Sequence, residues 1–196
     1  MRLLVLPDSL ALPETSSPTS PAKHRRRSLV IVAATAVLAL SLDQLSKAWV
    51  VRELIPERSV AVIGEALQFM FVRNPGAAFS LASGATWIFS IAAAAVVVCI
   101  VVLAGKLRSK SWAAVFGMLL GGTLGNLSDR LFREPAFGVG HVVDFIKVYG
   151  FPAIFNVADM FIVVSMALFA FLTLRGIRFD GTRSEVSRSR EALDGN

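Results

Sequence analysis

Two aspartates, Asp144 and Asp159, lie where the chain passes between its last two long apolar segments, and Asp159 falls in the opening turn of the final one. Ionisable side chains at membrane depth are rare because hydrocarbon solvates charge badly, so each is first considered a functional group. Two carboxyls that share one proton can act as an acid and a base. The pair therefore predicts hydrolysis by acid/base chemistry at the membrane.

Polar side chains accompany both aspartates. Asn156 and Asp159 are three residues apart and face the same way on a helix, whose first turn favours an ionised carboxylate. In GNLSDR, the residues Asn126, Asp129 and Arg130 place an amide, a carboxylate and a guanidinium on one helix face. Asp129 and Arg130 can form a paired helix end, or Arg130 can bind a peptide carbonyl or a phosphate. One ionised and one protonated carboxyl is the predicted resting state, with the proton assigned to neither.

Two upstream segments carry further candidates. Asp43 and Lys47 in LDQLSK are four residues apart, so they share a helix face and can pair. A paired aspartate is held ionised and is a poor proton shuttle, which predicts a bracing role for this pair. Asn74 follows an alternating segment around residues 67–71 that fits short strands or an interfacial hairpin. Because Asn74 precedes a Pro-Gly turn signal, turn chemistry and a role in the site both stay open.

The elements that must position these side chains are long and apolar. The chain is 55% hydrophobic and 17% charged, with a mean hydropathy of +0.64, which excludes an ordinary soluble domain and indicates a one-domain membrane protein. Segments near the roughly 20 residues of a spanning helix cover about 28–50, 86–105, 112–128 and 156–174. Gly117, Gly121 and Gly125 predict a smooth face on the third. The expected fold class is an all-α membrane protein of four transmembrane helices with a small extracytoplasmic β-rich or interfacial region.

Charge predicts the orientation of these helices. Basic residues flank the apolar segments at Lys23, Arg25, Arg26, Arg27, Lys106, Arg108, Lys110, Arg175 and Arg178. The two long loops, 51–85 and 129–155, each balance three basic against three acidic residues. Both termini are therefore predicted to be cytoplasmic, and both loops, with the catalytic candidates, to face outward. The net charge of +6 is interpreted as a topology signal and not as nucleic-acid binding.

The predicted organisation is a disordered cytoplasmic tail at 1–27, a four-helix domain at 28–174 and a charged cytoplasmic tail at 175–196. The first segment has an alternative, a cleavable signal peptide, because a basic run precedes apolar residues 28–42. Removing it would leave three spans and contradict the charge pattern. An uncleaved first helix is therefore preferred.

Metal and serine chemistry are disfavoured. His24 and His141, the only histidines, lie on opposite predicted sides, and Cys99, the only cysteine, is expected to be a small buried hydrophobe. The serines near the candidates have no histidine base close in sequence, and only Ser46 beside Lys47 leaves a Ser-Lys alternative. The sequence predicts neither a metal nor a cofactor.

Five sequence blocks, in order across the four segments, resemble lipoprotein signal peptidase, the type II signal peptidase of bacteria. They are LDQLSK (42–47), RNPGAAFS (73–80), GGTLGNLSDRLF (121–132), HVVDF (141–145) and FNVAD (155–159). The resemblance covers about residues 28–174. It implies an intramembrane aspartyl endopeptidase of the bacterial plasma membrane that cleaves prolipoproteins N-terminal to a cysteine carrying diacylglycerol.

The resemblance also implies residue roles. Asp144 and Asp159 are the implied catalytic dyad. The implied substrate-binding residues are Asn74, Asn126, Arg130 and Asn156, and the implied supporting residues are Asp43, Lys47 and Asp129. The expected partners are diacylglyceryl-prolipoprotein signal peptides and membrane lipids, with no nucleic acid, and the chain is expected to act as a monomer.

Two other function classes compete with the peptidase. A proton-coupled transporter would use Asp43, Asp129, Asp144 and Asp159 as a relay, but all four are predicted in the outer half of the membrane. A non-catalytic lipid-binding or assembly factor would explain the amides and Arg130 but not two close carboxyls. Physical reasoning alone also permits Asp129 with Asp159 as the pair, although Asp129 beside an arginine is the weaker proton carrier.

Overall fold

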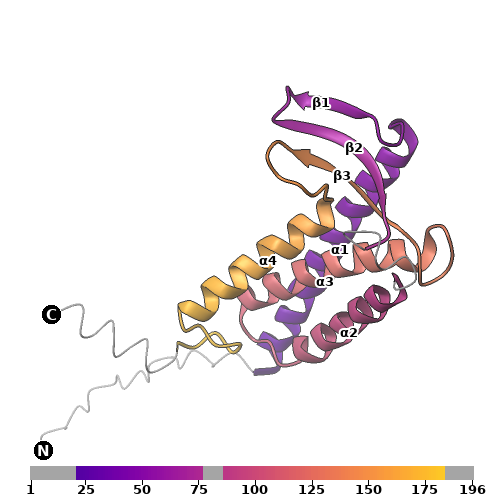
Figure 1. Ribbon diagram of the computed structural model, residues 1–196. Coiled ribbons are helices and arrows are strands. Elements are labelled where there is room, and N and C mark those ends of the chain that lie inside the picture. Colours follow the sequence, from indigo (N-terminus) through magenta and orange to yellow (C-terminus); the bar gives the residue numbers. More distant parts are fainter. Residues whose placement is uncertain (1–20, 77–85, 184–196) are drawn as a thin grey trace, which may run out of the picture.

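The computed structural model describes residues 21–76 and 86–183. Within these residues, four long helices pack together and a three-stranded antiparallel sheet stands at one end of them (Figure 1). The elements are α1 (Pro21–Glu53), β1 (Ser59–Ile63), β2 (Leu67–Asn74), α2 (Thr86–Ala104), α3 (Lys110–Phe132), β3 (Val142–Val148) and α4 (Val157–Leu174). The fold is therefore mostly helical, and the predicted β-rich region is the sheet.

Helix α3 lies at the centre and packs against α1, α2 and α4. Its glycines permit close approach: a Cβ on Gly121 would stand 2.5 Å from the Ala36 carbonyl oxygen of α1. On the α4 side, a Cβ on Gly122 would stand 2.7 Å from the Ala158 carbonyl oxygen. Only glycine fits at such distances. The predicted glycine face of α3 is confirmed.

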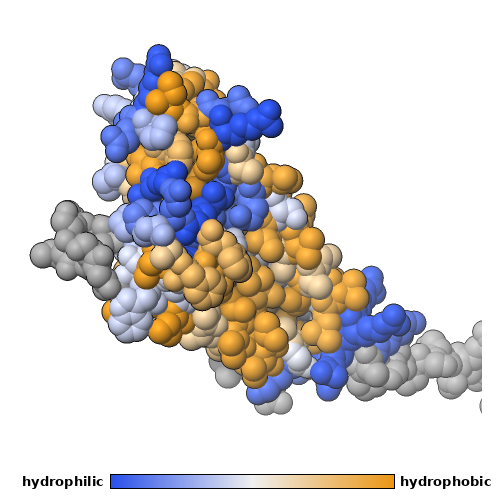
Figure 2. Space-filling model, turned by 90° about the vertical axis from the view of Figure 1, so that its right-hand side faces the viewer, coloured by the Kyte–Doolittle hydropathy of each residue, from blue (hydrophilic) through white to orange (hydrophobic). Residues whose placement is uncertain are grey.

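Three of the described helices, α1, α2 and α4, are long and apolar enough to cross a membrane. Helix α3 is not among them, although it has 23 residues, since its glycines and polar site residues lower its hydropathy. Its central position lets the other helices cover much of it. Figure 2 shows a broad apolar surface between two hydrophilic regions, as expected of a protein that crosses a bilayer. The fourth span stays a prediction.

The first helix begins earlier than predicted. Helix α1 starts at Pro21, so the expectation of a disordered tail is wrong for residues 21–27. Proline is favoured in the first turn of a helix, and neither Pro nor Gly follows before Pro56. Residues 1–20 of the predicted tail lie outside the described residues.

The segment after α4 folds back onto α3. Backbone amides of Arg108 and Ser109 both donate to the Phe179 carbonyl, at 3.0 and 3.1 Å, and the Trp112 indole donates to the Ile177 carbonyl at 3.0 Å. The predicted C-terminal tail therefore begins with a packed segment, and its residues 184–196 lie outside the described range. Packing of the Trp112 ring against Phe179 holds this segment in place. The charge pattern used to predict the tail does not reveal such a contact.

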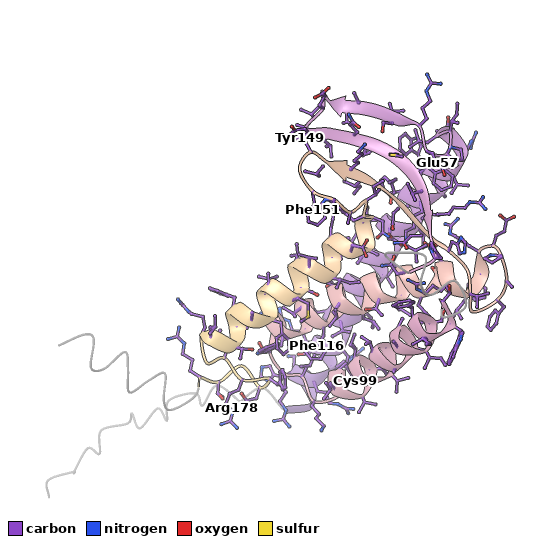
Figure 3. All side chains as sticks on the ribbon, in the orientation of Figure 1. Glu57, Cys99, Phe116, Tyr149, Phe151 and Arg178 are labelled. Carbon is purple, nitrogen blue, oxygen red and sulfur yellow. The ribbon has the colours of Figure 1, made fainter. Side chains whose placement is uncertain are left out.

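Cys99 lies on the exposed surface of α2, so its predicted burial inside the protein is wrong. Helix α2 turns most of its apolar side chains away from the other helices, because it packs only at one side of the bundle. The side chain lies among the apolar residues expected to face lipid (Figure 3).

The sheet has the order β1-β2-β3 and brings two candidate residues together. Asn74 pairs with Val142 and Val72 with Asp144, so Asn74 and Asp144 are diagonal neighbours on the β2-β3 ladder. Phe71 and Phe145 pack in a buried cluster with Val50 of α1, which fixes the sheet to the helices. The predicted strand around residues 67–71 is confirmed, whereas the strand form of 142–148 was not predicted.

Candidate active site

A capping box at the start of α4 positions Asp159. Asn156 is the N-cap: its side-chain oxygen accepts from the Asp159 amide at 3.0 Å, and the Asp159 carboxylate accepts from the Asn156 amide at 3.1 Å. These reciprocal bonds hold the carboxylate at the positive end of the helix dipole, where a negative charge is favoured. The predicted placement of Asp159 in the first turn is confirmed.

Strand β3 carries Asp144 to the same place. Its two carboxylate oxygens accept from the side-chain amides of Asn74 at 2.7 Å and Asn156 at 2.6 Å. Only 3% of the residue is exposed. The pKa of Asp144 is raised to about 6, mainly because burial deprives the ionised form of water. The hydrogen bond from Asn74 lowers this pKa, and the nearby Asp159 raises it.

Asn126 of α3 completes a bridge of amides between the two carboxyls. Its side-chain nitrogen donates to the Asp159 carboxylate at 2.8 Å. Its side-chain oxygen accepts from the side-chain nitrogen of Asn156 at 3.1 Å and from the Lys47 ammonium at 3.0 Å. The amides of Asn74, Asn126 and Asn156 are therefore all bonded to the carboxyl pair. This geometry orients the carboxyls and leaves these amides few free donors.

A buried ion cluster lies behind this bridge. Lys47 contacts the carboxylates of Asp43 and Asp129, each at 2.8 Å, and all three side chains are fully buried. Asp43 also accepts from the Ala158 amide at 2.9 Å, which ties α1 to the start of α4. Together with Asn126, the two aspartates use all three donors of the ammonium. The predicted Asp43–Lys47 pair is confirmed, and α1 is an integral part of the site.

Asp129 does not form the paired helix end with Arg130 that was one of its two predicted alternatives. It contacts Lys47 and, at 2.6 Å, Arg133, and it accepts from the Val143 amide at 3.2 Å. The suggested pair with Arg130 is wrong because adjacent helical residues point about 100° apart. Asp129 thus serves the ion cluster.

The Arg130 guanidinium packs over the Phe89 ring and not against the ion cluster. Its guanidinium carbon lies 5.2 Å from the centre of the Phe89 ring, and its buried Nη1 atom has no hydrogen-bond partner among the described residues. A Cβ on Gly76 would stand 3.0 Å from the same nitrogen. Within the described residues, the guanidinium therefore has one unpaired donor, Nη1, beside the turn that follows β2.

Asp144 and Asp159 line one cavity of about 720 Å³. Most of its wall is apolar, and it consists of Asn74, Val148, Phe151, Ala153, Ile154, Phe155, Met160, Val163 and Val164. Phe151 lies on the loop between β3 and α4, at the sheet end of the molecule (Figure 3). Asp129 is not part of this wall, so the geometry favours Asp144 with Asp159 over the alternative pair.

Two residues of the ion cluster were missed in the sequence. Arg133 stands four residues after Asp129, a spacing that could have revealed the pair. Gln44 donates to Asp43, to the Gly125 carbonyl and to Asp129, and no local pattern predicts contacts across more than 80 residues. Across 21–76 and 86–183, no three His, Cys, Asp or Glu side chains are grouped so as to hold a metal ion.

Residues 35–175, most of the chain, match the family described as Signal peptidase (SPase) II. The chain belongs to the signal peptidase II family. Lipoprotein signal peptidase of Leifsonia xyli subsp. xyli is 51% identical over 90% of this chain and 82% of that protein. The same enzyme of Rhodococcus jostii is 47% identical over 90% of this chain and 87% of that protein.

Solved structures agree with this assignment. Two structures described as bacterial membrane enzymes superpose with TM-scores of 0.64 and 0.65, at 29% identity over 76% of this chain and 88% and 94% of those chains. Family membership and the apolar helices make this chain a peptidase of a bacterial membrane. Nothing in these relationships supports the transporter.

Proposed function

We propose that this signal peptidase II family member is an aspartyl endopeptidase that removes the signal peptide of diacylglyceryl-modified prolipoproteins, cutting N-terminal to the lipidated cysteine. The single observation that carries the proposal is one cavity holding two carboxyls beside an apolar wall. The name lipoprotein signal peptidase, borne by relatives up to 51% identical, supports the substrate class.

In the proposed mechanism, Asp144 is the acid and Asp159 the base. The pKa of Asp144 is raised to about 6, so it holds a proton more readily than an ordinary carboxyl and can donate it to the scissile carbonyl oxygen. Asp159, whose carboxylate lies in the first turn of α4 within the capping box, takes a proton from the attacking water. Water thereby adds to the scissile carbonyl and gives a tetrahedral intermediate that has no covalent bond to the enzyme.

The amides act through the carboxyls in this proposal. Asn74 and Asn156 orient Asp144, and Asn126 orients Asp159, so the sequence-based role of these residues in substrate binding becomes mainly a positioning role. Arg130 keeps the role of substrate contact, since its Nη1 atom, which has no hydrogen-bond partner among the described residues, can bind a peptide carbonyl. Asp43, Lys47 and Asp129 support the helix start that carries Asp159.

The apolar wall suits a substrate that remains attached to the bilayer. Val163 is 66% exposed and Met160 49% exposed on the α4 side of the cavity, so the cavity opens onto a surface that lipid would cover. A peptide can enter there while its acyl chains stay in the membrane. Action as a monomer remains a prediction.

Orientation follows from charge. The basic residues at the start of α1, between α2 and α3 and after α4 lie opposite the sheet (Figure 1), which by the positive-inside rule supports cytoplasmic termini and a carboxyl pair near the outer face.

The test uses purified protein in detergent with one prolipoprotein, supplied with and without diacylglycerol on its cysteine. Cleavage of only the lipidated form, directly before that cysteine by mass spectrometry, is the expected result. Equal cleavage of both forms would refute the proposed substrate class, and no cleavage of either form would refute the proposed reaction.

A further inference from the structure

A larger cavity, of about 1060 Å³, lies at the end of the helices opposite the sheet. Its walls come from the start of α1, the turn between α2 and α3, the start of α3, the second half of α4 and the segment that follows α4. Figure 3 shows Arg178 at this end and Tyr149 at the other. The cavity shares no lining residue with the one that holds the carboxyl pair.

Positive charge dominates this second cavity. Arg25, Lys106, Arg108 and Arg178 line it together with a single carboxylate, Asp180. Asp180 already accepts hydrogen bonds from the Thr182 backbone and hydroxyl. No ion pair neutralises any of the four cations within the part of the chain that the structure describes. The cavity therefore carries an excess of three positive charges.

The floor of the cavity is apolar and fixed. The Trp112 ring packs edge-on against Phe179 at 4.8 Å and Phe169 at 5.1 Å between ring centres. The indole nitrogen of Trp112 donates to the Ile177 carbonyl, which holds the segment after α4 in place. Arg25 donates through Nε to the Gly105 carbonyl at 3.1 Å, and no hydrogen bond from its two terminal nitrogens to another described residue is present. Cations thus surround an aromatic floor.

We infer that this cavity binds an anionic phospholipid, with the phosphate held by the four cations and the start of an acyl chain lying on the aromatic floor. Basic pockets between membrane helices on the cytoplasmic side bind anionic headgroups, and aromatic rings favour the depth of the headgroups. The cavity combines basic side chains with the apolar rings of Trp112, Phe169 and Phe179 at the end of the helices opposite the sheet (Figure 3). A soluble polyanion would use the cations but not the apolar floor.

Native mass spectrometry of the full chain in neutral detergent tests the inference, with phosphatidylglycerol and phosphatidylcholine of identical acyl chains at equal concentration. Phosphatidylglycerol is expected to be retained preferentially. Replacing Lys106 and Arg108 together by Gln should weaken its retention by about fivefold per cation. Asp180→Asn should strengthen retention, so the test does not depend on a variant that loses binding.

Arg175→Gln is the matched control, since it removes the same charge at the same end but Arg175 packs over Phe171 outside the cavity. Equal retention of both lipids, or an equal loss in this control, would overturn the inference. Displacement of the lipid by an equal concentration of glycerol phosphate would also overturn it, because the ligand would then be a soluble phosphate. Retention that appears only after residues 184–196 are removed would assign the cavity to the chain's own terminus.

Discussion

Asp144→Asn should change how stability depends on pH. Burial raises the pKa of Asp144 from 3.8 to about 6, so between these values the folded protein binds a proton that the unfolded chain releases. The contribution of this group to the free energy of unfolding of the wild type is therefore full below this window, falls as pH rises through it, and stays lost above it. The shift corresponds to about 3 kcal/mol. Because the variant has no carboxyl at residue 144, its free energy of unfolding does not fall in this way.

The assay is equilibrium unfolding in mixed micelles, followed by circular dichroism from pH 4 to pH 7. The free energy of unfolding of Asp144→Asn minus that of the wild type should rise by roughly 2 to 3 kcal/mol across this range. Asp180→Asn is the control, because Asp180 is exposed and hydrogen bonds from Thr182 lower its pKa, so its difference should not rise with pH. A difference that stays level for Asp144→Asn would refute the raised pKa and with it the assignment of the acid.

The remaining predictions concern the amides and the ion cluster. Asn74→Ala removes a hydrogen bond that lowers the pKa of Asp144, so the alkaline limb of kcat/KM should move to higher pH; a limb that stays or moves down contradicts the role given to Asn74. Lys47→Met leaves two buried carboxylates without their cation and should cost about 3–5 kcal/mol of unfolding free energy, measured in mixed micelles. Arg52→Met, which breaks an exposed pair with Glu53, should cost less than about 1 kcal/mol; equal losses would contradict the buried cluster.

Local spacing accounts for what the sequence predicted well. Asp43 with Lys47 and Asn156 with Asp159 are helical neighbours, so a four-residue or three-residue interval is enough to place them together. The apolar segments likewise predicted the four helices, because burial in lipid or protein requires long apolar stretches.

Contacts between distant segments were not predictable in this way. Asp129 meets Lys47 across more than 80 residues, and the sequence instead suggested its chain neighbour Arg130. The strand form of β3 depends on pairing with β2, which a short apolar segment does not specify. The return of Phe179 onto Trp112 likewise depends on tertiary packing alone.

Single-turnover cleavage of a bound, lipidated prolipoprotein by the wild type, Asp144→Asn and Asp159→Asn tests the central claim most directly. Each proton transfer contributes about 10²–10⁴-fold, so each variant should lose at least that factor in rate while still binding the substrate with the affinity of the wild type. A variant that binds normally and cleaves within tenfold of the wild type would contradict the account of Asp144 and Asp159 as the acid and base.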